Sequence, residues 1–286
     1  MEALLPTGAM VDSCLPSLFP DSPRIIYSRN PLVEVICQLR FPSILRITTE
    51  PPVTFQEKIR GEYPLLTERS PESDIEIPPG VPASVAETIM KALPRRKLVG
   101  FDFVSADEKW KVSLTKEFLA LTTSKYTRWE DFRQHLEGPL SALIEVYSPA
   151  FCTRVGLRYQ DLVQRSKLGL AATTPWAQLL RGHIAGVLAP SELATTIEEH
   201  QCQTLIKLPA YGGKVRMRHG IVQTVDTNEE CFLIDSDFYT QERTKLTDVD
   251  GILGYFNRQS GRLFRWCIED RLHQAMEPGP VVATSA

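Results

Sequence analysis

An internal repeat with an offset of 120 residues constrains the fold of this chain more than any other feature of its sequence. Residues 116–118 (Lys-Glu-Phe) and 236–238 (Ser-Asp-Phe) each follow an apolar stretch, and Thr127 and Thr247 each begin an amphipathic one. A repeat is one structural unit used more than once, so it predicts the architecture before any single element is assigned. We therefore expect the chain to use the same set of elements twice.

Hydrophobic periodicity predicts the order β-α-βββ-α in each half of the chain. The first half is expected to contain a strand at 33–41, a helix at 54–63, strands at 98–104, 109–115 and 118–124, and a helix at 127–147. The second half is expected to contain a strand at 151–163, a helix at 175–188, strands at 202–208, 214–221 and 231–240, and a helix that begins at 247. We predict an α+β protein in which residues 32–150 and 151–276 form two tandem, pseudo-symmetric halves, with helices on one face of an antiparallel-rich sheet.

The ends of these elements are predicted from proline and from helix-capping residues. Residues 1–31 contain five prolines, which indicates a disordered lead-in or one that lies on the surface, and residues 277–286 are expected to form a disordered tail. Thr127 and Glu130 fit a capping box, in which each side chain bonds to the backbone of the other residue. Thr247 is expected to be the N-cap of the last helix.

Composition narrows the functional classes but does not select one. The formal net charge is -3, so the chain is not a globally basic nucleic-acid binder, although a local basic patch is compatible with this charge. The six cysteines are scattered and show no Cys-x-x-Cys spacing, which indicates free thiols in a reducing, cytoplasmic environment. No apolar run is long enough for a membrane span. No cofactor motif is present, so we expect no cofactor.

Asp235 and Asp237 are the strongest chemical candidates in the sequence. They alternate along the predicted strand at 231–240, so both carboxylates lie on one face, about 7 Å apart. Two carboxylates at this spacing are compatible with a shared divalent cation and therefore with a metal-dependent enzyme. The alternative interpretation is a solvated strand face whose aspartates pair with basic residues of 214–218 on a neighbouring strand.

The polar face of the predicted sheet is basic. The alternation that directs Val112, Leu157 and Val215 to the core directs basic side chains to the opposite face. The nine basic residues assigned to that face are Arg40, Lys109, Lys111, Arg154, Arg158, Lys207, Lys214, Arg216 and Arg218. Such a surface is suited to a nucleic-acid backbone or another polyanion. The alternative is that these side chains only keep solvent-facing strands from pairing with other chains.

These observations leave three functional hypotheses open. The first is a non-enzymatic binding or adaptor protein whose basic sheet face binds a nucleic acid, another polyanion or an acidic protein partner. The second is the metal-dependent enzyme that would use Asp235 and Asp237. The third is a small-molecule binder with a pocket between the helix at 127–147 and the sheet. No membrane partner is expected, and a homodimer is compatible with each hypothesis.

Two sequence stretches resemble a sporadically distributed family of uncharacterised bacterial proteins. Residues 30–35 (Asn-Pro-Leu-Val-Glu-Val), followed by Gln-Leu-Arg-Phe at 38–41, resemble its N-terminal signature. Residues 233–238 are similar to its C-terminal Leu-Asp-x-Asp-x-Phe stretch, except that Ile234 precedes the first aspartate. A further stretch, residues 110–127, looks like its central segment, and the resemblance covers nearly everything from 28 to about 276. It implies a bacterial cytoplasmic protein and supplies no catalytic residues. The duplicated order of elements is also similar to the TATA-binding-protein and helix-grip folds, at the level of topology alone.

Overall fold

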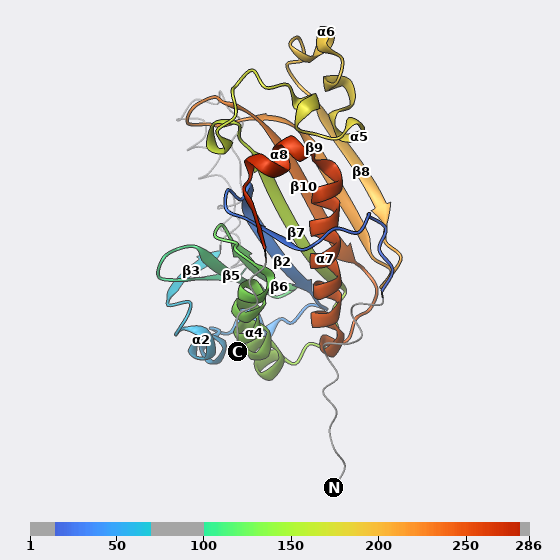
Figure 1. Cartoon of the computed structure of the whole chain (residues 1–286). Coiled ribbons are helices and arrows are strands. Elements are labelled where there is room, and N and C mark those ends of the chain that lie inside the picture. Colours follow the sequence, from blue (N-terminus) through green and yellow to red (C-terminus); the bar gives the residue numbers. More distant parts are fainter. Residues whose placement is uncertain (1–14, 70–99, 281–286) are drawn as a thin grey trace, which may run out of the picture.

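The computed structural model describes residues 15–69 and 100–280, and its centre is one large antiparallel sheet. The strands of this sheet are β2 (Leu32–Arg40), β3 (Leu65–Arg69), β4 (Gly100–Val104), β5 (Trp110–Thr115), β6 (Phe118–Thr123), β7 (Arg154–Val163), β8 (Gln201–Lys207), β9 (Lys214–Gln223) and β10 (Glu230–Thr240). They lie in the order β3-β4-β5-β6-β2-β7-β10-β9-β8, and every neighbouring pair is antiparallel (Figure 1).

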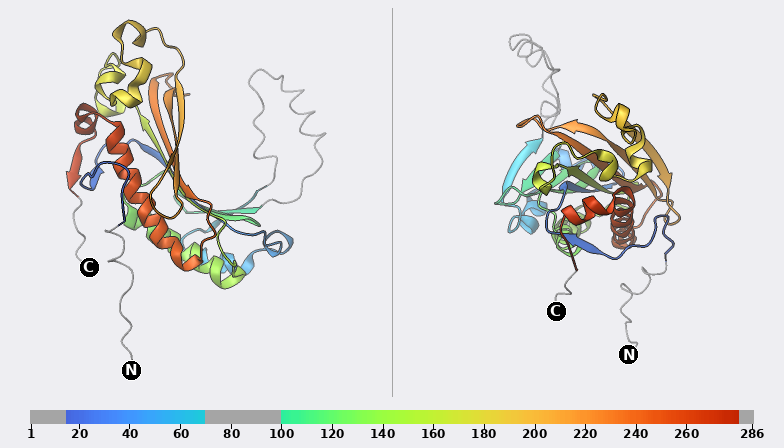
Figure 2. Two further views of the ribbon diagram at one scale, coloured as in Figure 1. Left: turned by 90° about the vertical axis from the view of Figure 1, so that its right-hand side faces the viewer. Right: turned by 45° about the horizontal axis from the view of Figure 1, so that its top comes forward.

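Two long helices cover one face of the sheet. They are α4 (Trp129–Tyr147) and α7 (Val249–Cys267), each of 19 residues, and Figure 2 shows both on the same side of the strands. The shorter helices are α1 (Arg46–Thr49), α2 (Val53–Ile59), α5 (Gly182–Ala185), α6 (Ser191–Ala194) and α8 (Asp270–Ala275). The 3-10 turns are η3 (Ser166–Leu168), η4 (Trp176–Gln178), η5 (Gly186–Leu188) and η6 (Leu246–Asp248). The predicted α+β class, with an antiparallel sheet and helices, is confirmed.

The core lies between this sheet face and the helices. Alternate residues of each central strand point to the helices, as the two-residue period of a strand requires. Leu157 of β7 and Phe238 of β10 are both fully buried and lie opposite each other. Phe238 packs against Phe256 of α7, with ring centroids 6.3 Å apart. The other face of the sheet therefore carries the polar residues.

The strand order is arranged about the pair formed by β2 and β7, which begin the two predicted halves. On one side β6, β5, β4 and β3 follow β2, and on the other β10, β9 and β8 follow β7, so β3 has no counterpart within this sheet. Cys37 and Leu157, which are 120 positions apart, lie directly opposite each other in this central pair. The first residues of α4 and α7 differ by the same 120 positions. The superposition of the two halves as whole units remains a prediction.

The equivalence of Phe118 and Phe238 is wrong. Leu121 lies beside Cys37 and Phe238 beside Leu157, so Leu121 occupies the place in the first half that Phe238 occupies in the second. Phe118 instead lies beside Arg40, on the polar face. The two strands are thus shifted by an odd number of residues relative to the repeat. An odd shift moves a side chain to the opposite face of a sheet.

The predicted helix caps are also wrong. The N-cap of α4 is Arg128, without a side-chain cap, because the Thr127 hydroxyl donates a hydrogen bond to the Asp131 carboxylate instead of accepting one from the backbone. Glu130 is also occupied elsewhere, by an ion pair with Arg24. Thr247 lies inside the 3-10 turn η6, which precedes α7. In both places local side-chain partners replace the expected contact with the backbone.

The predicted helix at 175–188 is broken into η4, α5 and η5. Gly186 has a φ of +49°, a left-handed value that glycine tolerates and that interrupts a right-handed helix.

Within the described residues, four cysteines are free and buried and Cys202 is free and exposed. No helix in the described ranges is long and apolar enough to cross a membrane.

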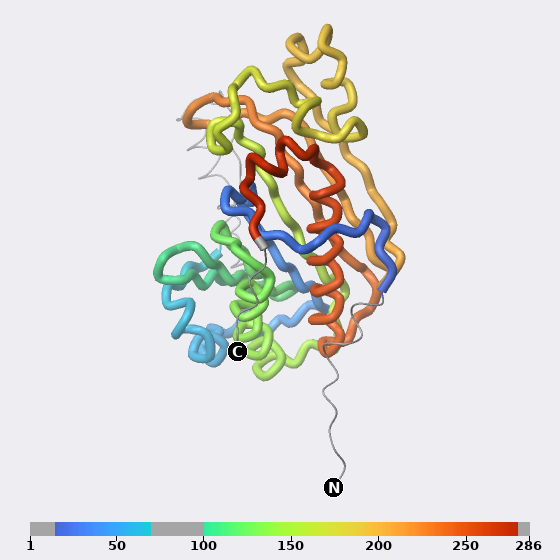
Figure 3. Tube along the Cα trace, in the orientation of Figure 1, coloured from blue at the N-terminus to red at the C-terminus, as the bar shows by residue number. Residues whose placement is uncertain are grey.

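Parts of the predicted lead-in and tail are ordered. Strand β1 (Ile25–Tyr27) pairs with β11 (Pro278–Pro280) in a separate two-stranded sheet. The segment that precedes β1, residues 15–24, crosses α7 as a strap (Figure 3). Phe19 of the strap is buried against Trp266, with ring centroids 5.7 Å apart. The tail was expected to be disordered, but residues 278–280 form a strand because β1 supplies partners for their backbone groups.

Candidate functional site

Five arginines surround a hollow of about 400 Å³ on the polar face of the sheet, which we term the arginine hollow. They are Arg40 of β2, Arg154 and Arg158 of β7, and Arg216 and Arg218 of β9. Between β7 and β9 lies β10, which contributes Asp235, Asp237 and Tyr239 to the same hollow. The structure thus brings the two candidate metal ligands and five of the nine predicted basic residues into one site.

Asp235 is held by a bidentate ion pair with Arg158. The Nε and Nη2 atoms of Arg158 donate to the two carboxylate oxygens at 2.6 and 2.7 Å, and Asp235 is only 4% exposed. This hydrogen bonding raises the pKa of Arg158 above its ordinary value. Arg218 approaches Asp235 from the other side, at 3.9 Å. A bidentate, charge-assisted pair fixes the plane of the guanidinium, so Arg158 is preorganised.

Asp237 and Tyr239 position two further arginines of the arginine hollow, Arg154 and Arg216. Nη2 of Arg154 donates to the Asp237 carboxylate at 2.6 Å. The guanidinium carbons of Arg154 and Arg216 lie 5.0 and 5.8 Å from the centre of the Tyr239 ring, a distance at which the π face attracts a cation. Arg216 forms no ion pair with any described residue, and neither does Arg40, whose Nε donates to Gln38.

These contacts favour the ion-pair interpretation of the two aspartates over the metal interpretation. Their main partners come from β7 and not, as the sequence suggested, from residues 214–218 alone. Asp235 is also buried and not solvated. A divalent cation would have to displace Arg158 and Arg154 from carboxylates that they already neutralise. The described residues contain no group of three or more His, Cys, Asp or Glu side chains that is placed to hold a metal ion.

The four predicted lysines lie outside the arginine hollow. Lys207 and Lys214 face each other across the β8–β9 pair and extend the positive surface beside Arg216. Lys109 and Lys111 line a separate hollow of about 450 Å³ near β3 and β6, together with Glu34 and Glu108. The nine residues therefore do not form one cluster.

Gly156 forms part of the arginine hollow, and its lack of a side chain makes room for Arg154. A Cβ at this position would lie 2.0 Å from Nη1 of Arg154. We expect Gly156→Ala to displace this guanidinium from Asp237. If the hollow takes a polyanion, the variant should also weaken heparin retention by about threefold, because Arg154 is no longer preorganised. Salt-gradient elution from heparin measures the change. Gly138→Ala, on an exposed turn of α4 where a Cβ meets nothing within 4 Å, is the matched control. Equal elution of both variants would contradict the assignment.

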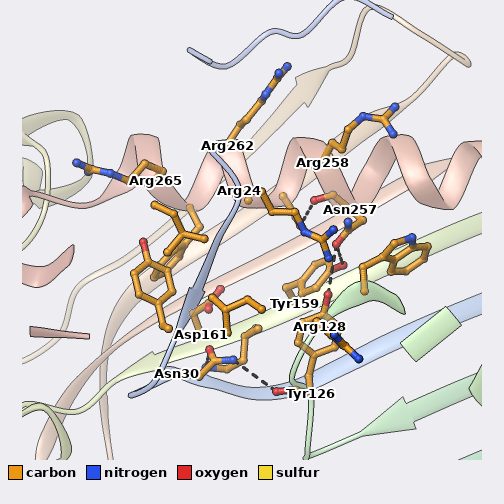
Figure 4. A pocket seen from close by; sticks show the side chains of 18 of the residues that line it. Arg24, Asn30, Tyr126, Arg128, Tyr159, Asp161, Asn257, Arg258, Arg262 and Arg265 are labelled. Atoms are coloured by element: carbon orange, nitrogen blue, oxygen red, sulfur yellow. Dashed lines mark hydrogen bonds between the residues drawn. The ribbon is translucent and has the colours of Figure 1, made fainter. Parts of the chain in front are cut away.

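A second cavity, of about 370 Å³, lies on the core side of the sheet between α7, the strap with β1, and the residues that lead into α4. Figure 4 shows Tyr159 and Asp161 of β7 in this cavity, with Asn257 and several arginines of α7 above them. We term it the Asp161 cavity. It differs from the predicted pocket beneath the helix at 127–147, because α7 and the strap provide most of its wall.

Hydrogen bonds fix the side chains on one wall of the Asp161 cavity. The hydroxyls of Tyr126 and Tyr159 both donate to Oδ1 of Asn257, at 3.3 and 3.0 Å. The Ser260 hydroxyl donates to the backbone oxygen of Asn257. Burial raises the pKa values of both tyrosines well above their ordinary value, so these hydroxyls remain donors at neutral pH. The wall is therefore preorganised around Asn257.

Asp161 has no partner among the residues that the structure describes. Its side chain is nine-tenths buried, with 6% of the residue exposed, yet it accepts no hydrogen bond and forms no ion pair within the described part of the chain. Desolvation, together with the negative charge of Asp235 across the sheet, raises the pKa of the Asp161 carboxyl to about 8. A buried polar group without a partner destabilises a fold, so its position in a cavity requires an explanation.

Asp161 was not among the residues that the sequence selected. A signal was present, because Asp161 continues the alternation of Val155, Leu157 and Tyr159 and so occupies a core-facing position of its strand. An acidic residue in such a position is rarely buried without a partner. Tyr126 and Asn257 gave no comparable signal, because their meeting depends on how α7 packs on the sheet.

Comparison with known proteins adds no functional assignment. No protein-family model matches the chain, and no curated protein sequence matches it. Among solved structures it is similar to the substrate-free duplicated taurocyamine kinase from Schistosoma mansoni, with 11% identity over 81% of this chain and 33% of that chain and a TM-score of 0.31. The chain is also similar to the same kinase with bound transition state analog components, with 12% identity over 87% of this chain and 35% of that chain and a TM-score of 0.34. The chain spans about a third of the length of these structures, and similarity at this level carries no argument about fold or function.

Proposed function

We propose that this protein is a binding or adaptor protein that takes a polyanion, such as a nucleic-acid backbone, in the arginine hollow. The observation that carries the proposal is the charge of the hollow. Five arginines face two aspartates, which leaves a formal excess of three positive charges. Arg40 and Arg216 have no ion-pair partner in the described ranges, so their guanidinium groups are available to an anion.

The arrangement also lowers the entropic cost of binding. Asp235 fixes Arg158, Asp237 fixes Arg154, and the Tyr239 ring supports Arg154 and Arg216. Side chains that are already ordered lose little freedom when a ligand arrives. Guanidinium groups donate in a planar fork that matches phosphate and carboxylate oxygens. Neutralisation of phosphates by such groups releases counterions, so affinity should fall steeply as salt increases.

The double charge reversal Arg216→Glu/Arg218→Glu tests this proposal. Both side chains lie on one face of β9 with intermediate or high exposure, so the fold should tolerate the change. We expect affinity for single-stranded nucleic acid or heparin to fall at least about tenfold at low salt, and the slope of log affinity against log salt to decrease by about two. Fluorescence anisotropy across a salt series measures both quantities.

Arg60→Glu/Lys167→Glu is the matched control. It makes the same change in net charge at exposed positions in the α2 C-cap and in η3, away from the arginine hollow. If both double variants weaken binding equally, the effect comes from net charge and the hollow is not the site. If the wild-type protein binds no nucleic acid or heparin at low salt but binds an acidic protein through the same arginines, the nucleic-acid part of the proposal is wrong.

A further inference from the structure

We propose that the Asp161 cavity binds a small apolar amine whose ammonium group pairs with the Asp161 carboxylate. The first observation is the unpartnered carboxyl itself. Asp161 lines the cavity, is nine-tenths buried and has no hydrogen-bond or ion-pair partner among the described residues. A ligand that brings a cationic donor supplies the missing partner and removes the cost of a buried, unsatisfied acid. This inference is independent of the arginine hollow, which lies on the opposite face of the sheet.

The second observation is the charge balance around the cavity. Arginines also line it, but the described acids already neutralise most of them: Arg24 pairs with Glu130, Arg128 with Asp131, Arg262 with Asp21, and Arg265 with Asp270. Asp161 is the acidic lining residue that lacks a basic partner among the described residues. A cation therefore gains more from this cavity than an anion, because the arginines have partners in the protein.

The third observation is the aromatic wall. Tyr27 and Phe264 meet edge to face with centroids 6.1 Å apart, and Tyr126 and Tyr159 meet in the same way at 5.8 Å. Trp129 also lines the cavity. Aromatic faces attract ammonium groups and provide apolar surface for a hydrocarbon or aryl tail. A volume of about 370 Å³ lies within the range of small-molecule sites. The walls thus favour a small, apolar molecule with one amino group.

A set of three probes with one aryl tail tests the charge of the preferred ligand. Phenethylamine, 2-phenylethanol and 3-phenylpropionate carry a cation, a neutral hydroxyl and an anion, respectively. We expect the amine to bind at least about tenfold more tightly than the alcohol, because a charge-assisted pair is stronger than a neutral hydrogen bond. We expect no binding of the carboxylate. Ligand-observed NMR titration of the full-length protein at about pH 9, where Asp161 is ionised and the amine is still protonated, gives the three dissociation constants.

The substitution Asp161→Asn tests whether the Asp161 carboxylate is the group that binds the amine. Asparagine keeps the size of the side chain but removes the negative charge, so amine affinity should fall at least about tenfold and alcohol affinity should stay within a factor of about two. Asp226→Asn, at an exposed loop position, is the control for the same chemical change and should leave both affinities unchanged. If the wild-type protein binds the alcohol as tightly as the amine, prefers the carboxylate or binds none of the probes, the proposal is wrong. The probe comparison in the wild-type protein decides this even if the Asp161→Asn variant does not fold.

Discussion

Replacement of Phe238 by alanine is expected to lower the free energy of unfolding by about 3 to 5 kcal/mol, the cost of removing a fully buried aromatic side chain. Phe238 is 0% exposed, lies between Leu157 and Val215 on neighbouring strands, and packs against Phe256 of α7. Its removal leaves a cavity at the junction of sheet and helix, where rigid strands on both sides prevent collapse. Equilibrium unfolding in urea, monitored by circular dichroism, measures the loss.

Phe118→Ala is the matched comparison. The repeat in the sequence makes Phe118 the counterpart of Phe238, but the register places Phe118 on the polar face, beside Arg40, with partial exposure. We expect Phe118→Ala to cost less than about 2 kcal/mol, because a side chain that remains partly solvated loses less on truncation. Equal losses in the two variants would mean that both side chains are buried to the same extent and would contradict the register.

Most strands of the sheet could be predicted from sequence because alternation is a local signal, whereas the edge strand β3 was not predicted. Strands β2, β5, β6, β7, β9 and β10 lie at the predicted positions within a few residues, since each carries enough apolar residues at a period of two. The pairing of β2 with β7 at the centre places residues 120 positions apart opposite each other, in agreement with the repeat offset. The offset does not extend to β10, because strand register depends on neighbouring strands and turns and not on spacing along the chain.

Two of the errors have a common physical cause, namely contacts between segments that are distant in sequence. Glu130 was assigned to a capping box but pairs with Arg24 of the strap, 106 positions away. The tail at 278–280 becomes a strand only because β1 lies beside it. None of these partners can be identified from local pattern alone.

The two candidate sites differ in the same way, because one depends in part on local alternation and the other on contacts between distant segments. The arginine hollow could be predicted in part, because alternation along β7 and β9 assigns Arg154, Arg158 and Arg216 to one face without knowledge of the strand order. That Asp237 would pair with Arg154 depends on β10 lying between these strands. The Asp161 cavity could not be predicted, since it is formed by the strap, α7 and the approach to α4.

Asp161→Asn is expected to make the protein more stable than wild type at pH 9 but not at pH 4. Burial raises the pKa of Asp161 to about 8 in the folded protein, whereas an aspartate in an unfolded chain has a pKa of about 3.9. Between these values the folded state retains a proton that the unfolded chain has released. Wild-type stability therefore falls as the pH increases through this window, by roughly 5 to 6 kcal/mol for a difference of about four pKa units. Asparagine has no such proton, so this contribution is absent in the variant.

The comparison isolates Asp161 because the groups that face it do not titrate in this window or are common to both proteins. Tyr27 of β1 has a pKa of about 12, burial raises the pKa of the Cys267 thiol of α7, and the hydrogen bond to Glu130 raises the pKa of Arg24. Urea denaturation of the two proteins at half-unit steps from pH 4 to pH 9 gives the difference in unfolding free energy. We expect this difference to be close to zero at pH 4, to grow with pH and to level off above pH 8. A constant difference across the range would show that Asp161 titrates as a solvated aspartate. An apolar amine bound at this site should lower the folded-state pKa of Asp161, so the difference should level off at a lower pH.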